Sequence, residues 1–210
     1  IYYLIGFLKE LKERSKRHQN WVQGAFVSFL FFGIFLLLTW PGYWSWDEFH
    51  ILAGIQDGAF PRWQGLLTAV LFTFYLYLIP SGAFFVLFQV IIVSCTLGYV
   101  YSVVCELFPE DRKNGWVVLL PLALPSSILM VLYPLRLTVY SMILLALFFR
   151  LIRILKVKGV EFNPVIELSS ISLAVTLLST WRPEGFFFLL LLPFVCWRLV
   201  LHPKKLRIAQ

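Results

Sequence analysis

The chain has 210 residues, of which 60% are hydrophobic and only 14% are charged, and its formal net charge is +7 at pH 7. Soluble domains average about 25% charged residues, so this composition excludes an ordinary soluble fold. The basic residues lie in short runs between apolar segments, which is typical of membrane topology signals and lipid contacts and not of a nucleic-acid-binding surface. We therefore expect a polytopic, all-α membrane protein that forms a single transmembrane domain over residues 1–210.

In chain order, residues 1–20 form a basic segment, and the clearest apolar segment follows at Trp21–Trp40. These 20 uncharged residues span about 30 Å as a helix, which matches the hydrocarbon thickness of a bilayer. The segment lacks a small-residue cleavage site, so we expect a membrane span and no signal peptide. Five more spans are expected, namely Ala83–Leu107, Trp116–Leu132, Leu135–Phe149, Val165–Thr180 and Gly185–Val200. Pro121 and Pro125 are expected to kink the second of these, and Pro193 the last.

The segment Gln64–Ile79 is apolar but has only 16 residues, about 24 Å as a helix, which is short for a crossing. Basic residues concentrate on the cytoplasmic side of membrane proteins, so their distribution discriminates between two topologies. If the segment does not cross, fifteen of the eighteen basic residues lie inside, and if it crosses only seven do. We therefore predict about six spans, both termini in the cytoplasm, and a re-entrant or interfacial helix at residues 64–79.

The predicted first outer loop, residues 41–64, carries two adjacent carboxylates, Asp47 and Glu48, followed by His50. Charges this close to a membrane are costly and often functional, so both acids are candidate catalytic residues. Ser45 stands three residues before Glu48, a spacing that also matches a capping box and a structural role at the start of a short amphipathic helix. His50 is a candidate substrate-binding residue, with a hydrogen-bonded partner of that helix as the alternative.

Aromatic residues precede the two carboxylates in the same loop. Tyr43 and Trp46 are candidate substrate-binding residues because aromatic rings can stack on sugars. Aromatic rings also anchor proteins at the membrane interface, and the sequence does not decide between the two roles.

Three arginines remain on the predicted outer face, each near the end of a span: Arg62, Arg136 and Arg182. A guanidinium suits bidentate contact with phosphate, so all three are candidate binding residues for an anionic, membrane-borne substrate. The alternatives are a snorkelling Arg136 and an interfacial anchor that Arg182 forms with Glu184, which is a further candidate binding residue.

The stretch Trp46-Asp47-Glu48-Phe49-His50, placed after a first transmembrane helix, resembles the Asp-Glu loop of GT-C membrane glycosyltransferases of the protein O-mannosyltransferase and aminoarabinose transferase group. The stretch Asp57-Gly-Ala-Phe-Pro-Arg-Trp-Gln-Gly-Leu-Leu is similar to the segment that these proteins place before a membrane-parallel helix. Arg182-Pro-Glu-Gly at the start of a Phe/Leu-rich helix resembles bacterial members. The similarity covers Trp21 to about Pro203.

The resemblance implies a GT-C-like fold and an enzyme that transfers a sugar, with inversion, from a polyprenyl-phosphate donor to a cell-envelope acceptor. It implies that Asp47 is the general base for the acceptor hydroxyl, and that Arg136 and Arg182 stabilise the lipid phosphate left behind. Some members use a divalent metal, and no ligand set for one is visible in the sequence. The expected partners are membrane lipids and the lipid-linked sugar, without nucleic acid. The short loops favour a bacterial cytoplasmic membrane, with the active site on its outer face.

The chain departs from the family in two respects. Members usually have more spans and often a soluble outer domain, so we expect a reduced member or a piece of a longer protein. Pro61-Arg62-Trp63-Gln64 replaces a proline-rich or histidine-containing segment, which leaves the contacts with the donor phosphate open. Two other functions fit the same features: a non-catalytic GT-C-like membrane subunit with further membrane subunits as partners, and a lipid-handling or transport protein.

Overall fold

The computed structural model describes residues 2–58, 66–110, 112–134, 136–156 and 164–196, and every regular element within these ranges is a helix. Helices satisfy their backbone groups within one segment, as a chain in lipid requires. In chain order the elements are α1 (Tyr2–Leu38), α2 (Trp46–Gln56), α3 (Leu66–Leu78), α4 (Gly82–Leu107), the 3-10 helix η2 (Arg112–Ala123), α5 (Pro125–Leu132), α6 (Arg136–Lys156), α7 (Pro164–Trp181), the 3-10 helix η3 (Pro183–Leu190) and α8 (Leu191–Cys196).

Three helices are long and apolar enough to cross a membrane by length and composition: Ser15–Leu38 within α1, all of α4, and Leu137–Lys156 within α6. They correspond to the predicted first, second and fourth spans, and they support an integral membrane protein. The apolar helices Leu67–Leu78, Val165–Trp181 and Glu184–Val195 are shorter. The count of about six spans therefore stays a prediction.

The predicted span at residues 116–132 is broken in the structure. η2 and α5 form a bent pair whose two halves meet at 76°, and they count as a fourth span only if taken together. Pro121 lies inside η2, Pro125 occupies the first turn of α5, and Leu124 between the helices has an extended backbone. A proline disfavours helical geometry in the residue before it, which explains the break at Leu124.

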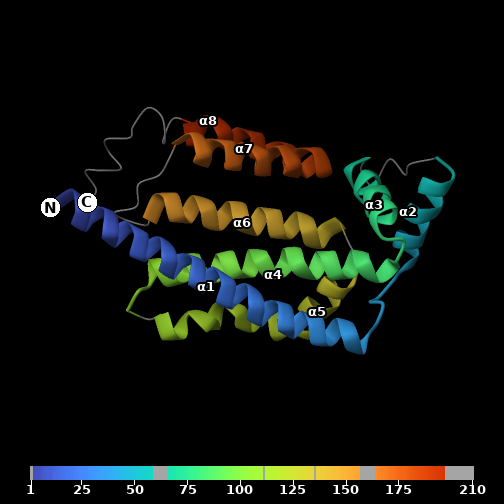
Figure 1. The fold of residues 1–210 in the computed structure, drawn as a ribbon. Coiled ribbons are helices and arrows are strands. Elements are labelled where there is room, and N and C mark those ends of the chain that lie inside the picture. The colour runs from blue at the N-terminus through green and yellow to red at the C-terminus, as the bar shows by residue number, and fades with distance from the viewer. Residues whose placement is uncertain (1, 59–65, 111, 135, 157–163, 197–210) are drawn as a thin grey trace.

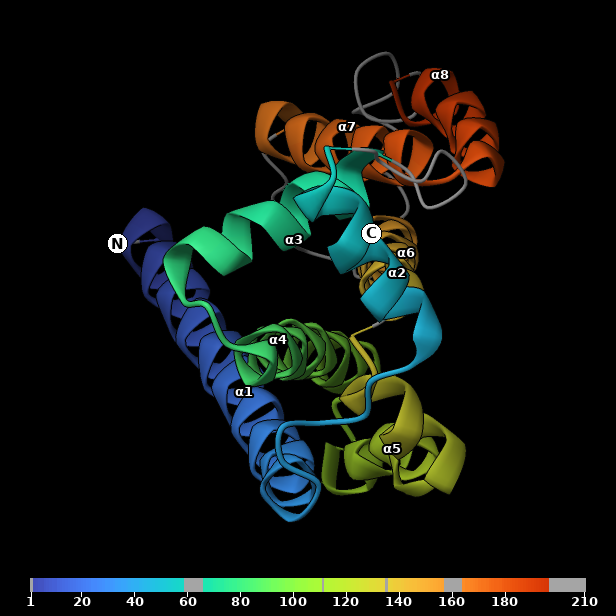
Figure 2. The ribbon, with the colours of Figure 1, turned by 90° about the vertical axis from the view of Figure 1, so that its right-hand side faces the viewer.

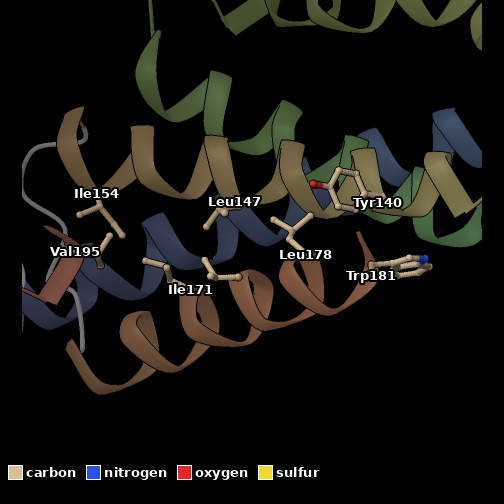
Figure 3. Packing of buried hydrophobic residues seen from close by; sticks show 8 residues of the cluster. Tyr140, Leu147, Ile154, Ile171, Leu178, Trp181 and Val195 are labelled. Atoms are coloured by element: carbon tan, nitrogen blue, oxygen red, sulfur yellow. The ribbon is translucent and has the colours of Figure 1, made fainter. Parts of the chain in front are cut away.

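The helices pack around two larger apolar clusters. In the first, Phe32 and Leu36 of α1 lie fully buried among α4 and α5 residues such as Val90 and Leu132. A close approach of α1 and α4 occurs at Gly98, where a Cβ atom would stand 2.4 Å from the Trp21 carbonyl oxygen. Only glycine fits there. The second cluster joins α6, α7 and α8, with side chains of α6 and α7 pointing toward one another in Figure 3.

Two short helices lie across one end of this bundle. Figures 1 and 2 show α2 and α3 there, beside the end of α7 and the beginning of α4, while α1 begins at the opposite end. We call the two ends the α2–α3 end and the opposite end. The segment predicted as re-entrant or interfacial thus contains α3, which runs across the bundle axis and not along α4 (Figure 2).

The opposite end carries a set of ion pairs between helices. Glu106 of α4 contacts Arg17 of α1 at 3.5 Å and Arg153 of α6 at 2.7 Å. Arg150 of α6 contacts Glu167 of α7 at 2.5 Å, and the Glu167 side chain is only 7% exposed. These pairs explain how charged residues are accommodated within an otherwise apolar bundle, since buried charges need partners.

Candidate functional site

Segments far apart in the sequence meet at the α2–α3 end. The Tyr43 backbone N–H donates to the Leu132 carbonyl at 3.1 Å, and the rings of Tyr43 and Tyr133 stack with centroids 5.6 Å apart. The Trp181 indole N–H donates to the Thr68 hydroxyl at 3.0 Å. The first loop is therefore a neighbour of the end of α5, and the start of α3 is a neighbour of the end of α7.

The two predicted catalytic carboxylates have different environments. Glu48 is 1% exposed, and its Oε2 atom accepts hydrogen bonds from the Ser45 backbone N–H at 2.7 Å and hydroxyl at 2.5 Å. This is the capping box of α2, which was one of the two alternatives for Glu48. Asp47 and His50 are exposed on the same helix. The capping geometry offers no support for a catalytic Glu48, so Asp47 is the stronger candidate for proton transfer.

The aromatic residues of the first loop divide into packed and exposed ones. The Trp44 ring contacts Phe49 and Phe85. Tyr43 is 37% exposed and stacks on Tyr133, whereas Trp46 is 81% exposed beside Asp47. Trp46 therefore has a free ring face for either of its predicted roles, sugar stacking or interface anchoring.

Arg182 is held between two groups at the junction of α7 and η3. Its guanidinium carbon lies 5.9 Å from the centre of the Tyr140 ring, and its Nη2 atom is 3.3 Å from Glu184 Oε1. The junction is tight, because a Cβ atom at Gly185 would stand 1.8 Å from the Leu178 carbonyl oxygen. The glycine of the Arg-Pro-Glu-Gly motif thus allows the turn that presents Arg182.

The other two predicted arginines are less well defined. The backbone of Arg136 begins α6, at the same end as α2 and α3 (Figure 1), but its side chain is outside the described part of the structure. Arg62 lies wholly outside the described residues. Their predicted contacts with phosphate stay predictions.

A small pocket with a cavity volume of about 40 Å³ lies beneath α3. It was not predicted from the sequence, although the helical spacing of its α3 residues gives one apolar face. Its lining comes from four helices and the turn before α6, and consists of Thr68, Leu71, Phe72, Tyr75, Phe85, Phe88, Gln89, Pro134, Val139 and Trp181. Such a largely apolar lining suits an apolar ligand.

The polar groups of this pocket are engaged with the protein. The Thr68 hydroxyl accepts from Trp181, and the Gln89 side-chain amide donates to the Val131 carbonyl at 2.8 Å and to the Tyr133 carbonyl. Burial raises the pKa of the Tyr75 hydroxyl to about 12, so this phenol is uncharged at physiological pH. The pocket interior is therefore neutral.

The cationic group nearest in sequence to this pocket is Arg182. Val139 and Trp181 line the pocket, and the residues that follow them, Tyr140 and Arg182, contact each other. The apolar pocket and the Arg182 guanidinium thus belong to the same end of the bundle, an arrangement that suits a lipid with an anionic head group.

No metal site is formed by the described residues, since nowhere among them do three or more His, Cys, Asp or Glu side chains gather. No protein-family model, curated protein or solved structure matches the chain. The chemistry available at the α2–α3 end consists of an exposed carboxylate on α2, a guanidinium at Arg182 and an apolar pocket.

Proposed function

We propose that the chain is an outward-facing membrane glycosyltransferase that transfers a sugar, with inversion, from a polyprenyl-phosphate donor to a cell-envelope acceptor. The observation that carries the proposal is the placement of three features at one end of a membrane-type bundle. The pocket under α3, Arg182 at the end of α7 and Asp47 on α2 all lie at the α2–α3 end. The resemblance of residues 46–50 and 182–185 to GT-C enzymes supplies the reaction type.

The donor lipid would use the pocket and Arg182 together. The small apolar pocket would receive the start of the isoprenoid chain, and the guanidinium would contact the phosphate. To bind phosphate, Arg182 must break its ion pair with Glu184 or contact both groups. The free-energy cost of breaking the pair is small because the Glu184 side chain is 64% exposed. Exposed ion pairs contribute about 0–1 kcal/mol, so phosphate can displace this one.

Asp47 would act as the general base. The acceptor hydroxyl gives its proton to the Asp47 carboxylate while its oxygen bonds to the anomeric carbon. The bond between that carbon and the phosphate oxygen breaks, and the electron pair leaves with the lipid phosphate. Arg182 stabilises the added negative charge, and a positioned base contributes about 10²–10⁴-fold to such reactions.

The same arrangement supports the proposed sidedness. Arg150, Arg153 and Lys156 lie near the end of α6, at the opposite end of the bundle from α2 and α3 (Figure 1). Basic residues favour the cytoplasmic side, which supports the proposal that the α2–α3 end is the outer face of a bacterial cytoplasmic membrane. In this orientation α3 is interfacial, and its exposed residues Phe74 and Tyr77 contact lipid.

The test is Asp47→Asn in protein reconstituted into liposomes with a panel of polyprenyl-phosphate hexoses. We expect release of polyprenyl phosphate to fall at least about 100-fold, the lower end of general-base contributions, without a change in thermal stability. Asp57→Asn is the matched control, because Asp57 is an exposed aspartate at the other end of α2. Unchanged sugar transfer by Asp47→Asn would remove the proposal.

A lipid-handling protein or non-catalytic subunit is the second candidate. It is favoured by the pocket and Arg182, which bind an anionic lipid without any contribution from Asp47. This function predicts that the wild-type protein binds the donor and that Arg182→Gln loses this binding. It also predicts that the wild-type protein transfers no sugar from any donor of the panel.

A further inference from the structure

Three aromatic residues belong both to the pocket and to the support of α2. Phe72, Tyr75 and Phe85 line the pocket, and they are also part of the cluster against which α2 packs. The ring centroids of Phe72 and Phe85 are 4.6 Å apart, and those of Tyr75 and Phe85 are 5.3 Å apart. We call these three residues the aromatic wall. A pocket occupant and α2 contact the same side chains.

The support of α2 is small. Its buried residues are Glu48 and Ile51, and the Glu48 carboxylate serves the cap of the helix itself. Ile51 is buried with Phe72 and Phe85, so this cluster has three buried members among the described residues, against eight in each of the two larger clusters. Elements held by few buried apolar contacts open most readily, and α2 therefore depends on the aromatic wall for its position.

We propose that Phe72, Tyr75 and Phe85 are positioning residues through which a lipid chain in the pocket fixes α2 and, with it, Asp47. Rings that face open space forfeit the dispersion contacts on that side, and an isoprenoid chain supplies them. Filling the pocket then restricts the wall and lowers the population of conformers in which α2 has moved away. That the lipid in the pocket is an isoprenoid chain rests on the proposed function.

An order of binding follows from this coupling. When the pocket is empty, α2 samples open conformers and Asp47 is not held in one place. When the donor lipid is bound, α2 is fixed and Asp47 is held for the acceptor.

Hydrogen–deuterium exchange of α2 tests the coupling directly. The protein is placed in phosphatidylcholine nanodiscs and titrated with a C15 isoprenyl monophosphate. If opening of α2 requires an empty pocket, exchange of its amides slows by the factor 1 + [L]/Kd, about 11-fold at a probe concentration of ten times Kd. Amides of α1 are the internal reference and keep their exchange rates.

Two phenylalanines of α4 provide a matched pair of variants. Phe85 lines the pocket and supports α2, whereas Phe88 lines the pocket and contacts Tyr75 but is outside the cluster beneath α2. At equal probe occupancy, Phe88→Leu should keep the slowing of α2 exchange and Phe85→Leu should lose most of it. Phe72→Leu, on α3, repeats the test if Phe85→Leu does not fold.

A second titration, with the C15 isoprenyl alcohol, distinguishes the effect of the isoprenyl chain from that of the phosphate. The aromatic wall contacts the chain, so the alcohol should slow α2 exchange as much as the phosphate does at matched occupancy. Probe binding with unchanged α2 exchange overturns the inference, as does equal slowing in all variants or a failure of both probes to bind. Sugar transfer that depends on Asp47 without any protection of α2 leaves the proposed function standing and removes only the coupling.

Discussion

The indole N–H of Trp181 donates a buried hydrogen bond to the hydroxyl of Thr68, and this 3.0 Å contact joins the last residue of α7 to the first turn of α3. Both residues line the pocket. The bond joins two residues of the pocket wall, and it crosses 113 positions of the sequence. The position of α3 over the bundle thus depends on this long-range polar contact together with apolar packing.

Thr68→Val should destabilise the protein by about 1–3 kcal/mol, because the buried Trp181 N–H loses its acceptor. Thermal unfolding in detergent, followed by circular dichroism, measures the loss. Thr73→Val is the matched control, since the Thr73 hydroxyl donates only to the Ala69 carbonyl within α3 and its replacement should change stability by less than about 0.5 kcal/mol. Equal effects of the two variants would contradict the importance of the contact between α7 and α3.

Glu48→Ala and Asp47→Asn should separate stability from activity. Glu48 accepts two hydrogen bonds from Ser45, so its truncation to alanine removes the acceptor of the capping box of α2, and cap losses cost about 0.5–2 kcal/mol. Asp47 is exposed and its variant should leave the melting temperature unchanged while transfer is lost. Melting curves and sugar transfer are measured on both proteins. A Glu48→Ala protein with wild-type stability would remove the capping interpretation.

The sequence predicted those parts of the fold that depend on local composition and spacing. The apolar segments around α1 and α4 were predicted from their apolar composition and length, and the Ser45-to-Glu48 spacing indicated the cap that the structure contains. The break at Leu124 was less predictable, because a proline in a membrane helix produces either a kink or a full interruption, according to the packing around it. Only the second outcome reduces the number of continuous spans.

The pocket was not predictable in the same way. Thr68, Gln89 and Trp181 come from three helices, and their partners lie tens of residues away in the sequence. No local pattern brings such residues together, so the site required the tertiary arrangement. Arg182 and Asp47 were identified from sequence as charged residues near span ends, but the contact of Arg182 with the Tyr140 ring was shown only by the structure.

Arg150→Met should destabilise the opposite end by about 3–5 kcal/mol, the usual loss when a buried pair is broken from one side. Arg150 pairs with Glu167, whose side chain is 7% exposed, so the variant leaves a carboxylate in an apolar setting. Glu184→Gln is the control, because the Glu184 side chain is 64% exposed and the pair that it forms with Arg182 contributes about 0–1 kcal/mol. Chemical denaturation in mixed micelles measures both. Arg150→Met combined with Glu167→Leu should recover most of the loss, which a purely steric effect of the methionine would not allow.

The orientation of α3 can be tested with three single cysteines in exposed described positions. Asp57 follows α2, Ser81 precedes α4, and Lys156 ends α6. If α3 lies in the outer interface, Asp57→Cys and Ser81→Cys both react with a membrane-impermeant maleimide added to intact cells. Lys156→Cys then reacts only after permeabilisation, because α4 and α6 carry the chain between the two ends of the bundle.

If α3 instead crosses the membrane, Asp57→Cys and Ser81→Cys react from opposite sides. The basic residues after α4 would then face outward, against their usual distribution. Ser81 is the decisive position, because it stands directly after the segment whose 13 helical residues reach about 20 Å, well short of a 30 Å hydrocarbon core. Labelling of Ser81→Cys from inside would place the pocket and Asp47 on different sides of the membrane and would end the proposal that they form one site.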